Sequence, residues 1–278
     1  MSASAGDSTK GSGDERRGQI TGGEATGKAW GFVLVVFAAS RLFYLTSGAL
    51  LVEAVPVHPF QGQTLDVPIG TLSIWAHFDG EHYTRIAESG YGAASPLLPS
   101  RYDLASPVFF PLYPLLTRSI ADLFGGPVSL GALSVYGVLI SLVAFCFALY
   151  FVYRVAEEGW GVRAAQGTVL ALAFFPTGFF FNAVYTESLF LALSAGAVWA
   201  AGVRKNFLLA CLLAGLATAT RNVGVLLLFP LVGKWAERRW YGWPTAYLAL
   251  VPAGLVAYMA YLWGRFGNPL LFYSEQVM

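Results

Sequence analysis

The sequence predicts an all-α fold, a polytopic transmembrane helical bundle of about six to seven apolar helices with a large extracytoplasmic loop that carries short surface helices. Hydrophobic residues make up 56% of the chain, whereas charged residues make up only 12%. Soluble domains are about a quarter charged, and charge is scarce here because it is costly in lipid. The apolar residues also fall in runs of membrane-spanning length.

The chain begins with a polar segment, residues 1–28, which is rich in Gly, Ser and Thr and has mixed charges. It has too few apolar residues to bury a core and too few for a signal peptide, so we predict a disordered tail. Residues 29–51 form the first predicted span and open a single transmembrane domain, 29–278. Arg41 lies near the middle of that span, and we expect it to face protein and pair with a carboxylate.

A polar loop, residues 52–126, follows the first span and is punctuated by Pro and Gly. The later apolar segments share spanning or near-spanning length and are 127–152, 164–184, 188–203, 207–219, 223–232 and 245–263. Two of them, 207–219 and 223–232, are short and flank Arg221, so we expect tilted or broken helices there.

Lysine and arginine are unevenly distributed among the loops. They favour a cytoplasmic N-terminus, because this orientation places Arg204, Lys205, Arg238 and Arg239 inside the cell. The long loop, residues 185–187 and Arg221 then all lie on the outer side. The unusual polar residues therefore gather at one face of the membrane, which is the plasma membrane if the source is prokaryotic.

The strongest local signal is the segment from Trp75 to Tyr91. It predicts a short helix with Asp79 as its N-cap and Gly90 just past its C-terminus. Helical spacing puts Asp79, His82 and Tyr83 on one face, and so short a helix can lie along the membrane surface.

Asp79 is the predicted catalytic base. The positive end of the helix dipole favours an ionised carboxylate, which can take a proton from an acceptor hydroxyl. A second interpretation makes Asp79 a simple cap and His82 a structural residue. A third is a divalent metal site, because His77, Asp79, Glu81 and His82 are ligand types, although their spacing matches no closed-site pattern.

Two further residues are candidates for substrate binding. Glu187 starts an apolar helix at the outer interface, where an acid can act as a dipole partner or can position a sugar hydroxyl. Arg221 lies between two short apolar segments, and its planar guanidinium suits the oxygens of a lipid phosphate. The Pro-rich segment Ser106–Arg118 fits either a re-entrant element that shapes a groove or a plain connector.

Some classes of function are disfavoured. The sequence contains no Walker loop, no dinucleotide-binding glycine fingerprint and no Gly-x-Ser-x-Gly elbow, so the donor of a transferase must come from within the membrane. A net charge of +1 gives no reason to expect a nucleic-acid partner. Cys146 and Cys211 lie in apolar runs and are best explained as core residues.

Four segments in order resemble the PIG-V family of GT-C glycosyltransferases, which comprises GPI mannosyltransferase 2 and its prokaryotic relatives. The segments are Phe78–Tyr83 (continuing to Gly90 and Tyr91), Phe109–Pro114, Tyr185–Phe190 and Ala219–Gly224. Each is weak alone, but four in order are fairly specific. Phe78 is a departure, since relatives often carry Trp there.

The resemblance implies inverting transfer of mannose from polyprenyl- or dolichyl-phosphate mannose to a glycolipid or protein acceptor, with Asp79 as the base. It further implies the endoplasmic reticulum membrane in eukaryotic relatives, and more helices after residues 266–270, so that this chain would be truncated. His82, Tyr83 and Glu187 would shape the sugar and acceptor site, with Arg221 at the donor phosphate. The alternatives are a transporter or flippase for polyprenyl-linked lipids, which needs polar residues at mid-membrane, and a non-catalytic membrane subunit.

Overall fold

The computed structural model describes residues 10–54, 74–92, 106–125 and 128–274, with side chains from residue 26 onward except those of 52 and 53. These ranges contain helices and no β-strand, which confirms the predicted all-α class. The elements are α1 (Lys10–Ala54), α2 (Asp79–Ser89), α3 (Leu112–Leu123), α4 (Leu130–Ala173), η2 (Gly178–Asn182), α5 (Glu187–Gly202), α6 (Phe207–Thr218), η3 (Asn222–Leu227), α7 (Leu228–Glu237), α8 (Trp243–Ala246), η4 (Tyr247–Leu250), α9 (Ala253–Phe266) and α10 (Leu271–Ser274).

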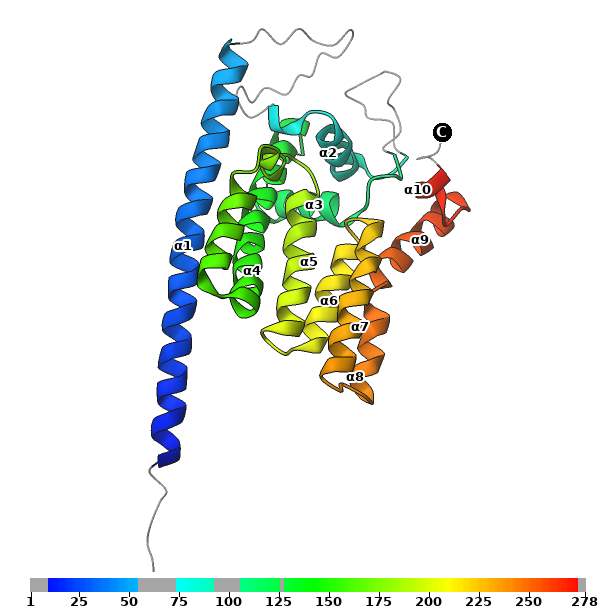
Figure 1. Ribbon diagram of the computed structural model, residues 1–278. Helices are drawn as coiled ribbons and strands as arrows, with labels where there is room; N and C mark the ends of the chain where they lie inside the picture. Colours follow the sequence, from blue (N-terminus) through cyan, green and yellow to red (C-terminus); the bar gives the residue numbers. More distant parts are fainter. Residues whose placement is uncertain (1–9, 55–73, 93–105, 126–127, 275–278) are drawn as a thin grey trace, which may run out of the picture.

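Helix α1 stands along one side of the molecule, with the other helices grouped beside its upper part (Figure 1). Its inner face packs on α4, where Trp30 stacks on Tyr150 with ring centroids 4.1 Å apart. Its outer face exposes Val35 and Leu42, as a lipid-facing surface requires. The helix begins at Lys10 and so continues into the predicted tail, because extending an existing helix costs less than starting one.

Two described helices, α1 over Thr26–Leu51 and α4, are long and apolar enough to cross a membrane. A third candidate span exists if α8–η4 and α9 together cross the membrane as one segment. This segment is bent by 47° at Pro252. Helices α5 and α6 match the predicted segments 188–203 and 207–219 but are shorter than a full span. The number of membrane crossings therefore stays a prediction.

Helix α4 corresponds to the predicted segments 127–152 and 164–184. It runs from Leu130 to Ala173, but its backbone is non-helical at Gly161, whose φ of 83° favours glycine, so it consists of two helices on either side of that residue. The second helix ends at Ala173 rather than at Val184, because Pro176 disfavours the helical conformation in the residue before it. The chain continues as the 3₁₀ helix η2 and an extended segment that leads into α5.

Arg41 is buried inside this part of the bundle and corrects a second expectation. Within the described residues it does not pair with a carboxylate: its Nη1 donates to Asn182 Oδ1 at 2.6 Å and to Gly178 O at 3.1 Å, and its Nη2 donates to Ala173 O at 3.0 Å. The guanidinium also lies 4.4 Å from the ring centroid of Phe145. Three neutral acceptors that α4 and η2 leave unpaired thus replace the expected acid, and they tie η2 to α1.

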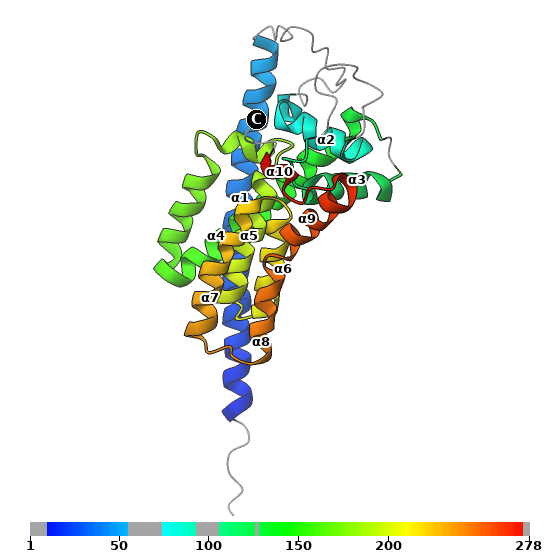
Figure 2. The same ribbon diagram turned by 90° about the vertical axis from the view of Figure 1, so that its right-hand side faces the viewer.

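The predicted loop places α2 and α3 at the end of the bundle where α1 terminates, close to α10 in both views (Figures 1 and 2). The stretches 55–73, 93–105 and 126–127 of this loop lie outside the described residues. Helix α2 is not a surface helix, because Tyr83 through Ala87 are all buried. It packs between α3 and α4, and its apolar and aromatic side chains are buried against these helices rather than in a membrane surface.

Candidate active site

The N-terminus of α2 is fixed against the segment that leads into α5. The backbone N–H of Val184 donates to the carbonyl of Trp75 at 2.8 Å. One residue further on, the hydroxyl of Tyr185 donates to the carbonyl of His77 at 3.2 Å. These two bonds bring the first turn of α2 next to the first turn of α5, although the two turns are about a hundred residues apart in sequence.

The sequence predicts Asp79 as the N-cap of α2, and this prediction is wrong. Asp79 is instead the first residue of the helix, and its side chain is exposed. The cap position is Phe78, which has φ 55° and ψ −118° and makes no side-chain capping bond. A bulky residue in this region costs about 1–3 kcal/mol, and such residues concentrate at functional sites. The sharp turn at Phe78 starts the helix, and the carboxylate of Asp79 is therefore not used as a cap.

The other end of α2 agrees with the prediction. Gly90 ends the helix with φ 77°, and its N–H donates to the carbonyl of Ile86 at 2.9 Å. Asp79 and Glu81 both lie in the first turn, near the positive end of the helix dipole. The position of Asp79 at the start of the helix therefore agrees with the prediction, although its role as the cap does not.

His82 and Tyr83 form the wall behind Asp79. The ring of His82 stacks on Phe109 with centroids 4.5 Å apart, and its Nδ1 is buried without a hydrogen-bond partner among the described residues. Burial and the nearby Arg85 lower the pKa of His82, so its imidazole is neutral at pH 7. Tyr83 is buried with its hydroxyl 3.4 Å from Thr186 Oγ1, and burial raises its pKa.

Glu187 and Arg221 form an ion pair, with Glu187 Oε1 3.1 Å from Arg221 Nη1. Both side chains are partly exposed, by 29% and 42% respectively. Glu187 is the first residue of α5, where the helix dipole favours its charge, and Arg221 immediately precedes η3. The sequence assigns these residues separate roles, whereas the structure shows that Glu187 also orients Arg221.

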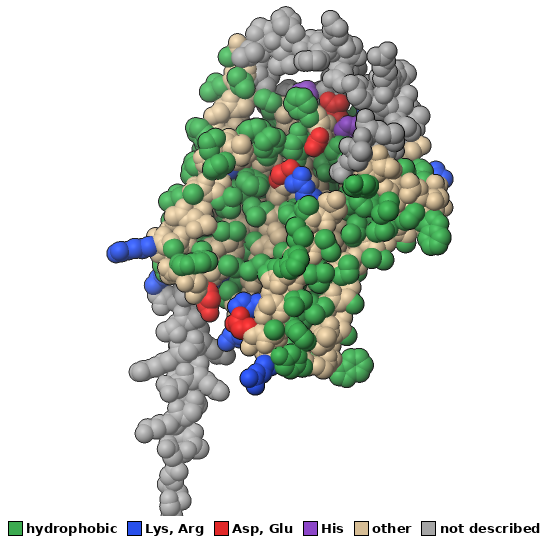
Figure 3. Space-filling view, turned by 45° about the vertical axis from the view of Figure 1, so that its right-hand side comes forward, with side chains coloured by type: hydrophobic (Ala, Val, Ile, Leu, Met, Phe, Trp, Pro, Cys, Tyr) green, Lys and Arg blue, Asp and Glu red, His purple; other side chains and the backbone are tan. Residues whose placement is uncertain are grey.

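The four sequence segments converge at this end of the bundle. The N–H of Leu112 donates to the carbonyl of Ala219 at 3.0 Å, which joins the Pro-rich segment to the segment that carries Arg221. Acidic, basic and His side chains gather on the same part of one face, above a mostly apolar surface (Figure 3). The five predicted site residues therefore belong to one neighbourhood.

Tyr185 is a site residue that sequence reasoning does not single out. Burial and then the charge of Asp79 raise its pKa to about 12, with smaller contributions from Glu187 and Glu81. Its hydroxyl thus stays protonated and can donate next to the carboxylates. The residue stands in one of the four segments, but only the contact with His77 reveals its position.

The described residues do not assemble a metal centre. No group of three or more His, Cys, Asp or Glu side chains in the described ranges is placed to hold a metal ion. His77 instead lies near Glu81, with Nδ1 3.8 Å from Oε1. This geometry gives the metal interpretation no support.

The family described as Mannosyltransferase (PIG-V) matches residues 30–234. The chain belongs to the PIG-V mannosyltransferase family. The match covers most of the chain, from α1 into α7, and includes all four segments and the five predicted site residues. No curated protein and no solved structure matches the chain. As a PIG-V member the protein is a membrane mannosyltransferase, which uses a sugar donor and an acceptor in a membrane.

Proposed function

We propose that the protein transfers mannose from polyprenyl- or dolichyl-phosphate mannose to a hydroxyl of a lipid-linked or protein acceptor on the outer face of the membrane, as in GPI mannosyltransferase 2-like enzymes. One observation carries this proposal: an exposed carboxylate, Asp79, and a half-exposed guanidinium, Arg221, lie in the same cluster. Both lie close enough to the buried Tyr83 to act on its pKa, which Asp79 raises and Arg221 lowers. Such an arrangement suits a reaction with a proton to remove and a phosphate to release.

The proposed reaction is one inverting displacement. The carboxylate of Asp79 removes the proton of the acceptor hydroxyl, whose oxygen forms a bond to C1 of mannose. The bond between C1 and the phosphate oxygen breaks, and its electron pair leaves with the lipid phosphate. Arg221 has five N–H donors, and within the described residues its side chain spends one of them, on Nη1, on Glu187. The others are available to the leaving phosphate.

Transfer itself tests the proposal. The purified protein in proteoliposomes is incubated with radiolabelled polyprenyl-phosphate mannose and an extract of membrane glycolipids. We expect a mannosylated lipid whose anomeric configuration is opposite to that of the donor. A product with retained configuration would contradict the single displacement, and label transfer from a nucleotide-sugar instead would contradict the donor.

Donor binding is expected to weaken when Arg221 is replaced by Lys. The ammonium keeps the positive charge but cannot offer a planar pair of donors to phosphate or keep the same contact with Glu187. We expect the apparent KM for the donor to rise about tenfold, while the KM for the acceptor stays within about twofold. Steady-state kinetics with each substrate varied in turn measure both constants, and an unchanged donor KM would remove Arg221 from phosphate binding.

The orientation of the protein is expected to be outward for α2 and α3 and inward for the α5–α6 turn. Cysteine placed at Leu123, which is exposed at the end of α3, should react with a membrane-impermeant thiol reagent in intact cells. Cysteine at Arg204 should react only after permeabilisation. Cys146 and Cys211 are changed to Ala in both variants. The reverse pattern would place the candidate site in the cytoplasm.

A further inference from the structure

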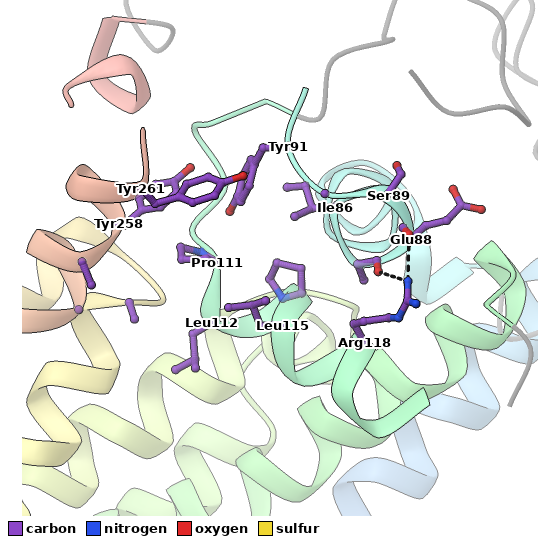
Figure 4. Close-up of a pocket in the computed structure, with 16 residues that line it drawn as sticks. Ile86, Glu88, Ser89, Tyr91, Pro111, Leu112, Leu115, Arg118, Tyr258 and Tyr261 are labelled. Atoms are coloured by element: carbon purple, nitrogen blue, oxygen red, sulfur yellow. Dashed lines mark hydrogen bonds between the residues drawn. The ribbon is translucent and has the colours of Figure 1, made fainter. Parts of the chain in front are cut away.

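A cavity of about 670 Å³ lies between the C-terminal half of α2, the start of α3 and the middle of α9. Figure 4 shows the rings of Tyr91, Tyr258 and Tyr261 on one side of it, with Ile86 on the other side and Leu115 below. This volume falls in the range of sites that bind small molecules. The predicted site residues do not line it, so it is a separate compartment of the same end of the bundle.

Two of the three tyrosine hydroxyls around this cavity already form hydrogen bonds inside the protein. Tyr91 donates its hydroxyl to Phe109 O at 2.6 Å, and Tyr258 donates to Pro107 O at 2.7 Å. Both rings therefore present carbon surface to the cavity rather than hydroxyl groups. A sugar needs hydrogen-bond partners at nearly every carbon, and this lining offers few of them. The lining suits a hydrocarbon.

The charged residues that line the cavity are Glu88 and Arg118, and the guanidinium of Arg118 is already bonded within the protein. Its Nε donates to Asp122 Oδ1 at 2.9 Å, and its Nη1 donates to the carbonyl of Glu88 at 3.1 Å (Figure 4). A carboxylate and the last carbonyls of α2 thus neutralise this guanidinium. Arg118 thus uses both its Nε and its Nη1 within the protein, whereas the side chain of Arg221 uses only its Nη1 among the described residues, so Arg221 keeps more N–H donors for a lipid phosphate.

The cavity is adjacent to the Arg221 segment through Ala219, which lines its wall two residues before Arg221. Other lining residues, Leu115 on α3 and Ala257 on α9, are exposed, so the wall opens toward the apolar exterior beside a candidate span. A molecule with an anionic head and a hydrocarbon tail therefore matches this arrangement of a positive charge at Arg221 beside an apolar cavity. In such a molecule the head would contact Arg221 and the tail would enter the cavity from the membrane.

We propose that this cavity binds the first isoprenoid units of the lipid-phosphate sugar donor, with the phosphate at Arg221. The assignment rests on the proposed function for the identity of the donor. In this proposal the cavity binds the donor only, and the acceptor approaches from the side of Asp79. Donor recognition is then divided between an ionic contact at the phosphate and hydrocarbon burial between α2, α3 and α9.

Filling the cavity tests the proposal. Ala257→Trp adds a ring from the α9 wall, and the matched control Ala260→Trp adds the same ring at an exposed position of α9 outside the cavity. We expect Ala257→Trp to raise the KM for a long-chain polyprenyl-phosphate mannose about tenfold or more, because several methylene groups lose their contact. The KM for a donor with a single isoprene unit should stay within twofold, and the control should change neither constant.

A binding experiment separates this inference from the proposed function. A long-chain isoprenyl phosphate that carries a photoreactive diazirine is crosslinked to the protein in detergent, and the labelled peptides are identified. We expect label on α2 and α9 that Ala257→Trp and Leu115→Trp abolish and Ala260→Trp retains. This result would support the cavity even if the protein failed to transfer mannose.

Three outcomes would overturn the proposal. In the first, label lies elsewhere or is insensitive to both cavity variants. In the second, Ala257→Trp raises the KM for the acceptor rather than for the donor, which would assign the cavity to the acceptor lipid. In the third, the short-chain and long-chain donors are affected equally, which indicates a general loss of structure. Leu115→Trp fills the cavity from α3, and the two variants must agree.

Discussion

Replacing Asp79 by Asn is expected to lower mannosyl transfer by about two to four orders of magnitude, the usual scale for loss of a general base. Asn keeps the size of the side chain and can still bind a hydroxyl, but it does not accept a proton. The structure strengthens the test, because the N-cap of α2 is Phe78 and not Asp79, so the substitution does not change the cap residue. Stability should therefore change little, and the effect should fall on kcat more than on the KM of either substrate.

The matched control for this variant is Glu81→Gln. Glu81 lies in the same first turn of α2, and its carboxylate is near His77 rather than free at the helix start. We expect its transfer rate to stay within a few-fold of the parent protein. Initial rates are measured with donor and acceptor both saturating, on proteins of matched melting temperature. If Glu81→Gln lost more activity than Asp79→Asn, the base would be Glu81.

Local motifs in the sequence predict residues that the structure brings together at one end of the bundle, and three of these residues lie at helix termini or breaks. Asp79 and Glu187 both occupy the first position of a helix, and Arg221 sits in the break between α6 and η3. Breaks and termini leave signals in the sequence, such as glycine, proline and polar residues between apolar runs. The family match then confirms the resemblance read from the four segments.

Contacts between distant segments could not be read from the sequence. The pairing of Glu187 with Arg221 depends on how α5 and α6 pack, and spacing along the chain does not determine that packing. The sequence predicts Asp79 as the cap because Asp is a favoured cap residue, whereas the turn at Phe78 leaves no signal in the sequence. The end of α4 does have a signal in the sequence, namely Pro176. The long apolar run around this proline nevertheless favours the prediction of a helix that continues to Val184.

Arg41 gives the clearest case of a partner that sequence reasoning cannot supply. A charge inside a span predicts a buried partner, and an acid is the expected type. The structure provides instead the carbonyl of Ala173 at the end of α4, the carbonyl of Gly178 at the start of η2 and the side-chain amide oxygen of Asn182. Arg41 therefore stabilises the irregular backbone that carries the chain to Glu187.

Arg41→Met is expected to destabilise the protein by about 3 kcal/mol or more, because three buried acceptors lose their donor at about 1–3 kcal/mol each. The melting temperature should fall on the order of 10 °C. Methionine has a similar length, so the change removes the hydrogen bonds without leaving a large cavity. Circular dichroism of the purified protein in detergent measures the transition. Transfer activity should fall with it, since η2 leads directly to the first turn of α5.

The control is Leu42→Met on the next position of α1, which is exposed on the outer face. It changes another side chain of the same helix without touching η2, and we expect its stability to lie within about 0.5 kcal/mol of the parent protein. Equal melting temperatures for Arg41→Met and Leu42→Met would show that the Arg41 contacts make no net contribution to the free energy of unfolding. Arg41→Lys distinguishes charge from geometry, because its single ammonium cannot reach acceptors on both α4 and η2 as the guanidinium does, and it should recover only part of the loss.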